Sequence, residues 1–93
     1  MSGGHFDYAY SSVNEFSTRL REELAKGKEH FNLNDEVFSR LLLLVIQAEK
    51  LSTLMHAAEW LMSGDFGNDD FIAISDTAEL DFLKRITSLE KPA

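Results

Sequence analysis

The stretch VFSRLLLLVIQAEKLSTLMHAAEWLM, residues 37–62, decides the fold of this chain. Its apolar side chains recur in steps of four and three residues, at Val37, Leu41, Leu44, Ala48, Leu51, Met55, Ala58 and Met62. Only a continuous α-helix aligns residues with this spacing into one stripe. The sequence therefore predicts an all-α domain of three to four helices packed around one long central helix.

The ends of the long helix are marked by capping residues, which place it at about residues 34–62. Asn34 is a favourable N-cap, and Ser63-Gly64 supplies the left-handed conformation that commonly ends a helix. The stripe is covered either by the other helices of the same chain or by the long helix of a second copy. Because 93 residues bury only a modest core, we expect a homodimer.

Shorter helices are predicted on both sides of the long one. Ser12 and Glu15 have the spacing of a capping box, which favours a helix over residues 13–27 after an N-terminal arm, residues 1–11, docked on the helical body. A further helix is expected over residues 68–90, bent or broken near 75–77, where Ser, Asp and Thr interrupt the apolar spacing.

The overall composition is that of a single globular domain with an acidic net charge of −7 and no cysteine. The longest unbroken apolar run, Leu41 to Ile46, is six residues, far below the roughly 20 that cross a bilayer. The first ten residues lack the basic and apolar regions of a secretory signal. We therefore expect no membrane contact and a cytoplasmic location.

Acidic residues dominate the C-terminal third, at Asp65, Asp69, Asp70, Asp76, Glu79 and Asp81, with no Lys or Arg among them. This charge disfavours direct contact with nucleic-acid phosphates or anionic lipid. The acidic side chains form either a solvated face or a binding surface for a protein with a basic site.

Aromatic residues are the second candidate binding feature. Phe6, Tyr8 and Tyr10 lie close together near the N-terminus, and Trp60 lies near the end of the long helix. These rings either pack against the helices of the domain itself or form a recognition surface, since tyrosine and tryptophan carry much of the binding energy at interfaces.

Catalytic and cofactor-binding constellations are not recognisable in the sequence. His56 and Glu59 lie on neighbouring turns of the predicted helix, but one such pair is too few for a metal site. Asp65, Asp69 and Asp70 lack the alternating acids and terminal glutamate of a calcium loop. We therefore predict a protein that is not an enzyme and has no cofactor and no metal site.

The opening MSGGHFDY and the segment HAAEWLMSGDFGNDDF, residues 56–71, resemble a group of small proteins of phages and prophages. The corresponding residues are Ser2, Gly3, Gly4, His5, Phe6, Asp7, Tyr8, Trp60, Leu61, Ser63, Gly64, Asp65 and Phe71. This chain departs from the group in its leucine-rich centre. The resemblance implies a phage origin and a helical build, and it supplies no reaction or site.

Together these features favour a small acidic phage accessory protein that acts by binding another protein. The hypothesis is occlusion of a basic site on a host or defence protein, such as one that handles nucleic acid. Two alternatives stay open: a small-ligand module that binds a nucleotide or metal, and a structural or assembly factor of the virion.

Overall fold

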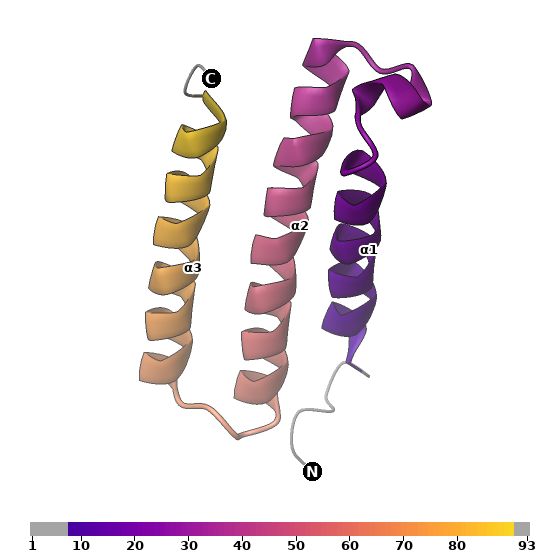
Figure 1. Ribbon diagram of the computed structural model, residues 1–93. Coiled ribbons are helices and arrows are strands. Elements are labelled where there is room, and N and C mark those ends of the chain that lie inside the picture. Colours follow the sequence, from indigo (N-terminus) through magenta and orange to yellow (C-terminus); the bar gives the residue numbers. More distant parts are fainter. Residues whose placement is uncertain (1–7, 91–93) are drawn as a thin grey trace.

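The computed structural model describes residues 8–90 of the chain (Figure 1). Its elements are α1 (Ala9–Leu24), a short 3₁₀ helix η1 (Lys28–Phe31), α2 (Asp35–Met62) and α3 (Asn68–Glu90). No strand occurs among these residues. The predicted all-α fold with one long central helix is confirmed.

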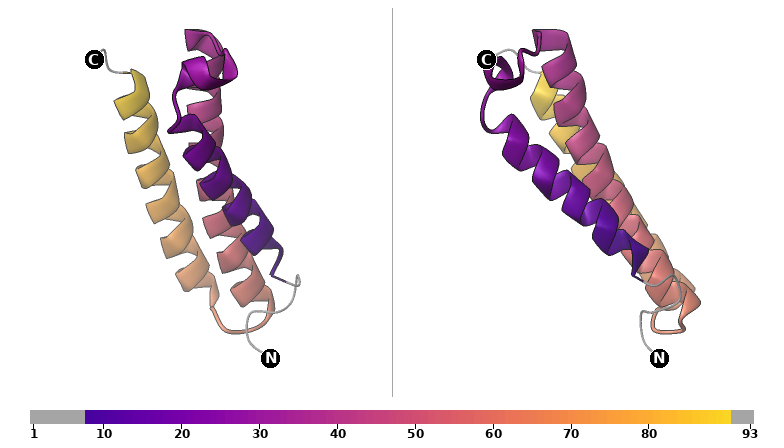
Figure 2. Two further views of the ribbon diagram at one scale, coloured as in Figure 1. Left: turned by 45° about the vertical axis from the view of Figure 1, so that its right-hand side comes forward. Right: turned by 90° about the vertical axis from the view of Figure 1, so that its right-hand side faces the viewer.

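The three α-helices form an open arrangement rather than a closed bundle. Helices α1 and α3 both run antiparallel to α2 and pack on it from opposite sides (Figures 1 and 2). The molecule measures 46 × 25 × 14 Å. Helix α2 is therefore the only element that contacts both of its neighbours extensively.

The two ends of α2 match the capping residues in the sequence. The backbone N–H of Val37 donates to the Asn34 side chain at 2.8 Å. Gly64 has a φ of 85° just after the C-terminus of the helix, a conformation that glycine adopts without steric cost. Lys28 of η1 forms an ion pair with Asp35 at the start of α2. The hydrogen bond to the Asp35 carboxylate and the negative charge of that carboxylate raise the pKa of Lys28 above its ordinary value.

The predicted start and end of the first helix are wrong. Helix α1 begins at Ala9 instead of residue 13 and ends at Leu24 instead of residue 27. The residue before it, Tyr8, is left-handed with a φ of 58° and has no side-chain cap. Tyr10 belongs to the helix and not to an arm, because its backbone and ring are held against α2, as described below.

The predicted break near residues 75–77 is absent. Helix α3 is continuous from Asn68 to Glu90. Ile74, Ala78 and Phe82 are partly buried at helical spacing across this segment, and the ammonium of Lys50 lies 4.5 Å from the centre of the Phe82 ring. Packing against α2 therefore outweighs the local capping preference of Ser, Asp and Thr.

The α1–α2 contact is built on small side chains. Ser17 is 0% exposed, and Ala48 and Ser52 are buried opposite α1. The Ser52 hydroxyl donates to the carbonyl of Tyr10 at 3.1 Å. Small residues at a helix contact let the two backbones approach closely, so this contact leaves little space for a larger side chain.

The chain's own helices, one of the two covers considered for the apolar stripe, cover only part of it. Ala48 is buried and Leu41, Met55 and Ala58 are half-buried. Val37, Leu44, Leu51 and Met62 remain 40%, 38%, 50% and 56% exposed. Helices α1 and α3 flank α2 and leave one of its sides open.

The open side also changes the expectation about membrane segments. By length and composition α2 could cross a bilayer, whereas its short unbroken apolar run suggests that it could not. In the fold, 28% of the most apolar 18-residue window of α2 is buried. Glu49 and Lys50 lie near its middle, where charged side chains in a bilayer are costly.

Candidate functional site

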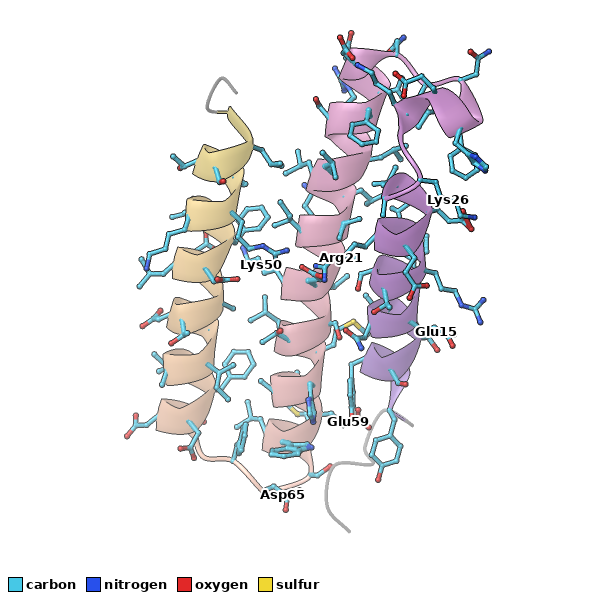
Figure 3. All side chains as sticks on the ribbon, viewed as in Figure 1. Glu15, Arg21, Lys26, Lys50, Glu59 and Asp65 are labelled. Atoms are coloured by element: carbon cyan, nitrogen blue, oxygen red, sulfur yellow. The ribbon has the colours of Figure 1, made fainter. Side chains whose placement is uncertain are left out.

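The α2–α3 end of the molecule carries three of the predicted acidic residues. Asp65, Asp69 and Asp70 are exposed around the loop that follows α2, and Figure 3 shows Asp65 in this loop. The Asp70 carboxylate accepts the backbone N–H of Gly67 at 2.8 Å. It therefore caps the start of α3, and Asp69 lies in the same first turn.

The other three acidic residues do not join this group. Glu79 forms an ion pair with Lys50, and Asp81 lies 3.9 Å from Arg85 on another side of α3. A helix turns by about 200° over two residues, so Glu79 and Asp81 point in nearly opposite directions. Asp76 is exposed. The structure therefore divides the predicted acidic surface of residues 65–81 into separate parts.

A ladder of aromatic rings lies at the same end as Asp65. The rings of Tyr10 and His56 stack with centroids 4.0 Å apart and an interplanar angle of 8°. His56 meets Trp60 edge-to-face at 4.6 Å, and Trp60 meets Phe66 at 4.8 Å. Tyr8, whose ring centroid lies 6.3 Å from that of Tyr10, extends the ladder outwards. We call these five residues the aromatic ladder.

The aromatic ladder combines internal packing with exposure. Tyr10, Trp60 and Phe66 are half-buried, whereas Tyr8 is 48% exposed. Edge-to-face contacts fix the orientation of each ring, so the exposed edges form a rigid surface. The candidate Phe6 lies outside the described residues.

Glu59 has a structural role that its sequence position did not reveal. Its side chain is 1% exposed, and one carboxylate oxygen accepts the backbone N–H of Tyr8 at 2.8 Å. Figure 3 shows Glu59 at the lower end of α1. A carboxylate here meets the positive end of the α1 dipole, so α2 supplies the cap that the sequence of α1 lacks.

His56 and Glu59, which lie on neighbouring turns of α2, have separate partners. His56 stacks between Tyr10 and Trp60, while Glu59 is held at the start of α1. Within residues 8–90, no three His, Asp or Glu side chains gather in an arrangement that could hold a metal ion.

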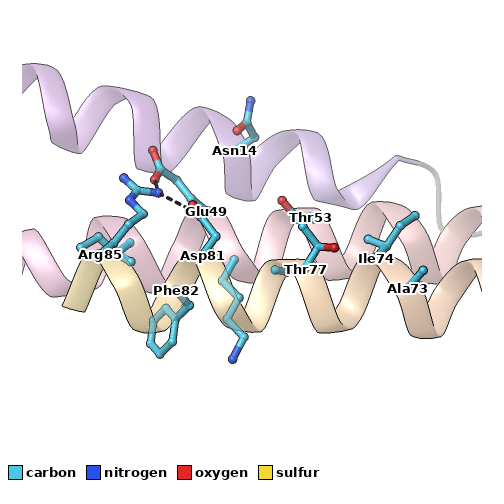
Figure 4. Close-up of a pocket in the computed structure, with 12 residues that line it drawn as sticks. Asn14, Glu49, Thr53, Ala73, Ile74, Thr77, Asp81, Phe82 and Arg85 are labelled. Atoms are coloured by element: carbon cyan, nitrogen blue, oxygen red, sulfur yellow. Dashed lines mark ion pairs between the residues drawn. The ribbon is translucent and has the colours of Figure 1, made fainter. Parts of the chain in front are cut away.

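A groove runs between α1 and α3, with α2 as its floor (Figure 4). Its central cavity has a volume of about 630 Å³. The Glu49 carboxylate spans the groove, pairing with Arg21 of α1 through one oxygen and with Arg85 of α3 through the other. The two outer helices, which lie on opposite sides of α2, are thereby joined through a single carboxylate.

We expect Glu49→Ala to lower the free energy of unfolding by about 1–2 kcal/mol, because two arginines lose their shared partner. Urea unfolding followed by circular dichroism measures the effect. Glu36→Ala is the matched control, since it breaks one ion pair with Arg40 on an exposed helix turn and should change the value by less than about 0.5 kcal/mol. An equal effect of the two substitutions would contradict the bridging role.

The lower end of the groove lies beside the aromatic ladder. A cavity of about 240 Å³ is lined there by Thr53, His56, Ala57, Trp60, Phe66 and Ile74. It is smaller than the roughly 300–1,000 Å³ of most small-molecule sites.

Among the described residues, the Lys and Arg side chains are confined to one half of the molecule. The half that contains the ladder, residues 8–18 and 51–83, has no Lys or Arg, and its acidic residues are Glu15, Glu59, Asp65, Asp69, Asp70, Asp76, Glu79 and Asp81. We call it the acidic half. Every Lys and Arg of the described residues lies in 19–50 or at 84–85, and Figure 3 shows Arg21, Lys26 and Lys50 above Glu59 and Asp65.

No family model, curated protein or solved structure matches the chain.

Proposed function

We propose that this chain is a protein-binding module that works by occlusion, and that the end of its acidic half binds a basic site on another protein. The observation that carries the proposal is the meeting of two features at one end of the molecule. The aromatic ladder provides a rigid apolar surface there, and Asp65, Asp69 and Asp70 surround the adjoining loop.

The two features have different tasks in binding. Carboxylates attract a basic surface over a distance and set its orientation, whereas aromatic rings supply contact area that excludes water. Tyr8 is the most exposed ring of the ladder and also carries a hydroxyl group for hydrogen bonding. A rigid helical body behind the ladder keeps the entropy cost of binding low.

A protein with a basic surface fits the end of the acidic half better than a nucleic acid or an anionic lipid does. Nucleic-acid phosphates and anionic lipids would be repelled by a half of the molecule that has carboxylates and no cation. Nucleic-acid-handling proteins carry such basic surfaces. The resemblance to phage proteins makes a cytoplasmic host or defence protein of this class the proposed target, and its occlusion the proposed effect.

The test replaces three carboxylates by amides of the same shape. Asp65→Asn, Asp69→Asn and Asp70→Asn together keep side chains that can cap α3 but remove three charges. We expect proteins captured from a host-cell extract by the immobilised wild-type chain at low salt to bind the triple variant about tenfold more weakly, because each of the three exposed ion pairs that are lost contributes about 0.2–1 kcal/mol. Titration of the purified partner measures this change.

The matched control removes three exposed acids at the other end of the molecule, by Glu22→Gln, Glu29→Gln and Glu36→Gln. It should leave partner affinity within about twofold. The captured protein should also lose its nucleic-acid binding in a mobility-shift assay when the chain is added. Equal effects of the two triple variants, or a partner whose nucleic-acid binding persists, would reject the proposal. Recovery of the chain in purified virions would instead support an assembly role.

A further inference from the structure

A broad apolar face lies on the side of the molecule opposite the groove. Its large exposed side chains are Phe16, Val37, Leu44, Leu51, Met62, Ile72 and Leu83. Two residues along a helix correspond to a turn of about 200°. Leu51 is two residues from Glu49, and Leu83 is two residues from Asp81, and both acidic residues line the groove. These leucines therefore point away from it, and we call their side the apolar face.

The apolar face is large for a surface left in water. An aromatic side chain such as that of Phe16 offers roughly 150–250 Å², and the large aliphatic side chains offer somewhat less, so the seven at about half exposure present on the order of 500 Å². This lies towards the upper end of the range for the largest apolar patches on monomeric proteins, about 300–600 Å². The half-buried neighbours Leu43, Leu54 and Leu61 add to this exposed apolar area. With them, the area approaches the roughly 800 Å² that each partner buries in a standard interface.

The spacing along α2 indicates what kind of element fits this face. Val37, Leu44, Leu51 and Ala58 follow one another at intervals of seven residues. A seven-residue repeat keeps a row of side chains facing one partner helix that lies nearly along the same axis. The complementary helix is thus long and apolar, and α2 of a second copy has both properties.

We infer that two copies of this chain associate through their apolar faces, with the two α2 helices antiparallel. Charge decides the direction. A parallel pair would set the two acidic halves side by side, whereas an antiparallel pair sets each acidic half against the half that holds every described Lys and Arg. The inference is independent of the proposed function, since it uses the opposite face of the molecule.

Arg40 supports the same direction. It lies one turn from both Val37 and Leu44, and its side chain is 76% exposed. In a parallel pair it would meet Arg40 of the second copy. In the antiparallel pair it meets the C-terminal end of the other α2, where the helix dipole is negative and Asp65 follows.

The first experiment measures mass by sedimentation equilibrium. The wild-type chain, 10.5 kDa as a single copy, should sediment as a dimer at micromolar concentration. Leu51→Glu should shift it to the monomer mass, raising the dissociation constant at least 100-fold, because each copy would bury a carboxylate near the centre of the interface. Circular dichroism checks that the variant keeps its helices, since Leu51 is half exposed in the single copy.

Leu80→Glu is the matched control. Leu80 is 60% exposed and lies two residues from both Ala78 and Phe82, which face α2, so its side chain points away from α2. It lies at the outer edge of α3, about 60° round the helix from Leu83, and is therefore remote from a contact between two α2 helices. This variant should remain dimeric. A monomeric wild-type chain, or equal loss of the dimer in both variants, would overturn the inference. Vesicle binding would also overturn the inference. If the wild-type chain binds phosphatidylcholine vesicles and the Leu51→Glu variant does not, the apolar face binds lipid instead of a second copy.

The second experiment tests the direction through engineered cysteines, which the chain otherwise lacks. Val37→Cys and Met62→Cys are prepared separately and treated with a short bismaleimide. Each variant alone should remain uncoupled, whereas an equal mixture should give the mixed dimer, because residue 37 of one copy lies near residue 62 of the other. Efficient coupling of each variant with itself would show a parallel pair instead.

The mass measurement also separates this inference from the proposed function. The three Asp→Asn changes at positions 65, 69 and 70 should leave the dimer at low salt within about tenfold of its wild-type dissociation constant while partner binding falls. Leu51→Glu should abolish the dimer and preserve partner binding by each single copy.

Discussion

Glu59→Ala is expected to lower the free energy of unfolding by about 2–3 kcal/mol, the largest effect of a single truncation outside the apolar core. The substitution leaves the Tyr8 N–H without its acceptor at 2.8 Å, removes the carboxylate from the positive end of α1, and opens a cavity at a site that is 1% exposed. In a domain of this size the loss corresponds to a fall in Tm of roughly 10–20 °C.

Urea unfolding at fixed protein concentration, followed by circular dichroism, measures the change in stability. Glu59→Gln keeps an acceptor oxygen and nearly the same volume, so about half of the stability should return. Glu22→Ala, on an exposed site of α1, should cost less than about 0.5 kcal/mol. If Glu59→Ala were as mild as Glu22→Ala, the capping role would be wrong.

Ser17→Leu is expected to cost about 2–3 kcal/mol because its side chain has no space between α1 and α2. Ser17 is 0% exposed, and its hydroxyl only donates to the carbonyl of Asn14 in its own helix at 2.8 Å. A leucine there must separate two helices that touch through small residues. The same urea titration detects the effect.

Two variants separate packing from hydrogen bonding at this contact. Ser17→Ala removes only the local hydrogen bond and should change stability by less than about 1 kcal/mol. Ser12→Leu adds the same side chain at an exposed position of the same helix and should be nearly neutral. Equal costs for Ser12→Leu and Ser17→Leu would contradict the close approach of α1 and α2.

The parts of the fold that the sequence predicted are those determined by neighbouring residues. Asn34 caps α2 through an amide three residues away, and Gly64 ends α2 by its own backbone conformation. Periodicity likewise fixed α2 as a helix because every turn repeats the same apolar positions. Such signals depend only on local geometry.

The parts that the sequence did not predict depend on the positions of other helices around α2. Glu49 and Glu59 both lie outside the apolar stripe, which is typical of exposed side chains, yet Glu49 joins α1 to α3 and Glu59 caps α1. Their surroundings arise only when α1 and α3 are in place. The start of α1 shifted to Ala9 for the same reason, since its cap comes from α2.

The candidate site shows the same division between local and distant determinants. Asp65, Asp69 and Asp70 lie together because one short loop and the first turn of α3 carry them, whereas helix rotation separates Glu79 from Asp81. The sequence left open whether the tyrosines and Trp60 pack on the domain itself or form a recognition surface, and it did not place Trp60 near Tyr10. Tertiary contact brings them together through His56, which joins Tyr10 to Trp60.

The confinement of the described Lys and Arg residues to one half of the molecule also affects how the protein moves before any contact forms. The molecule is 46 Å in its longest dimension, and its two ends differ in charge. It therefore experiences a torque in the electric field of a basic surface, which turns the α2–α3 loop towards that surface. This steering acts over about 8 Å at physiological salt and about 30 Å at 0.01 M. Association rates with a basic partner should therefore rise steeply as salt is diluted, while dissociation rates change far less.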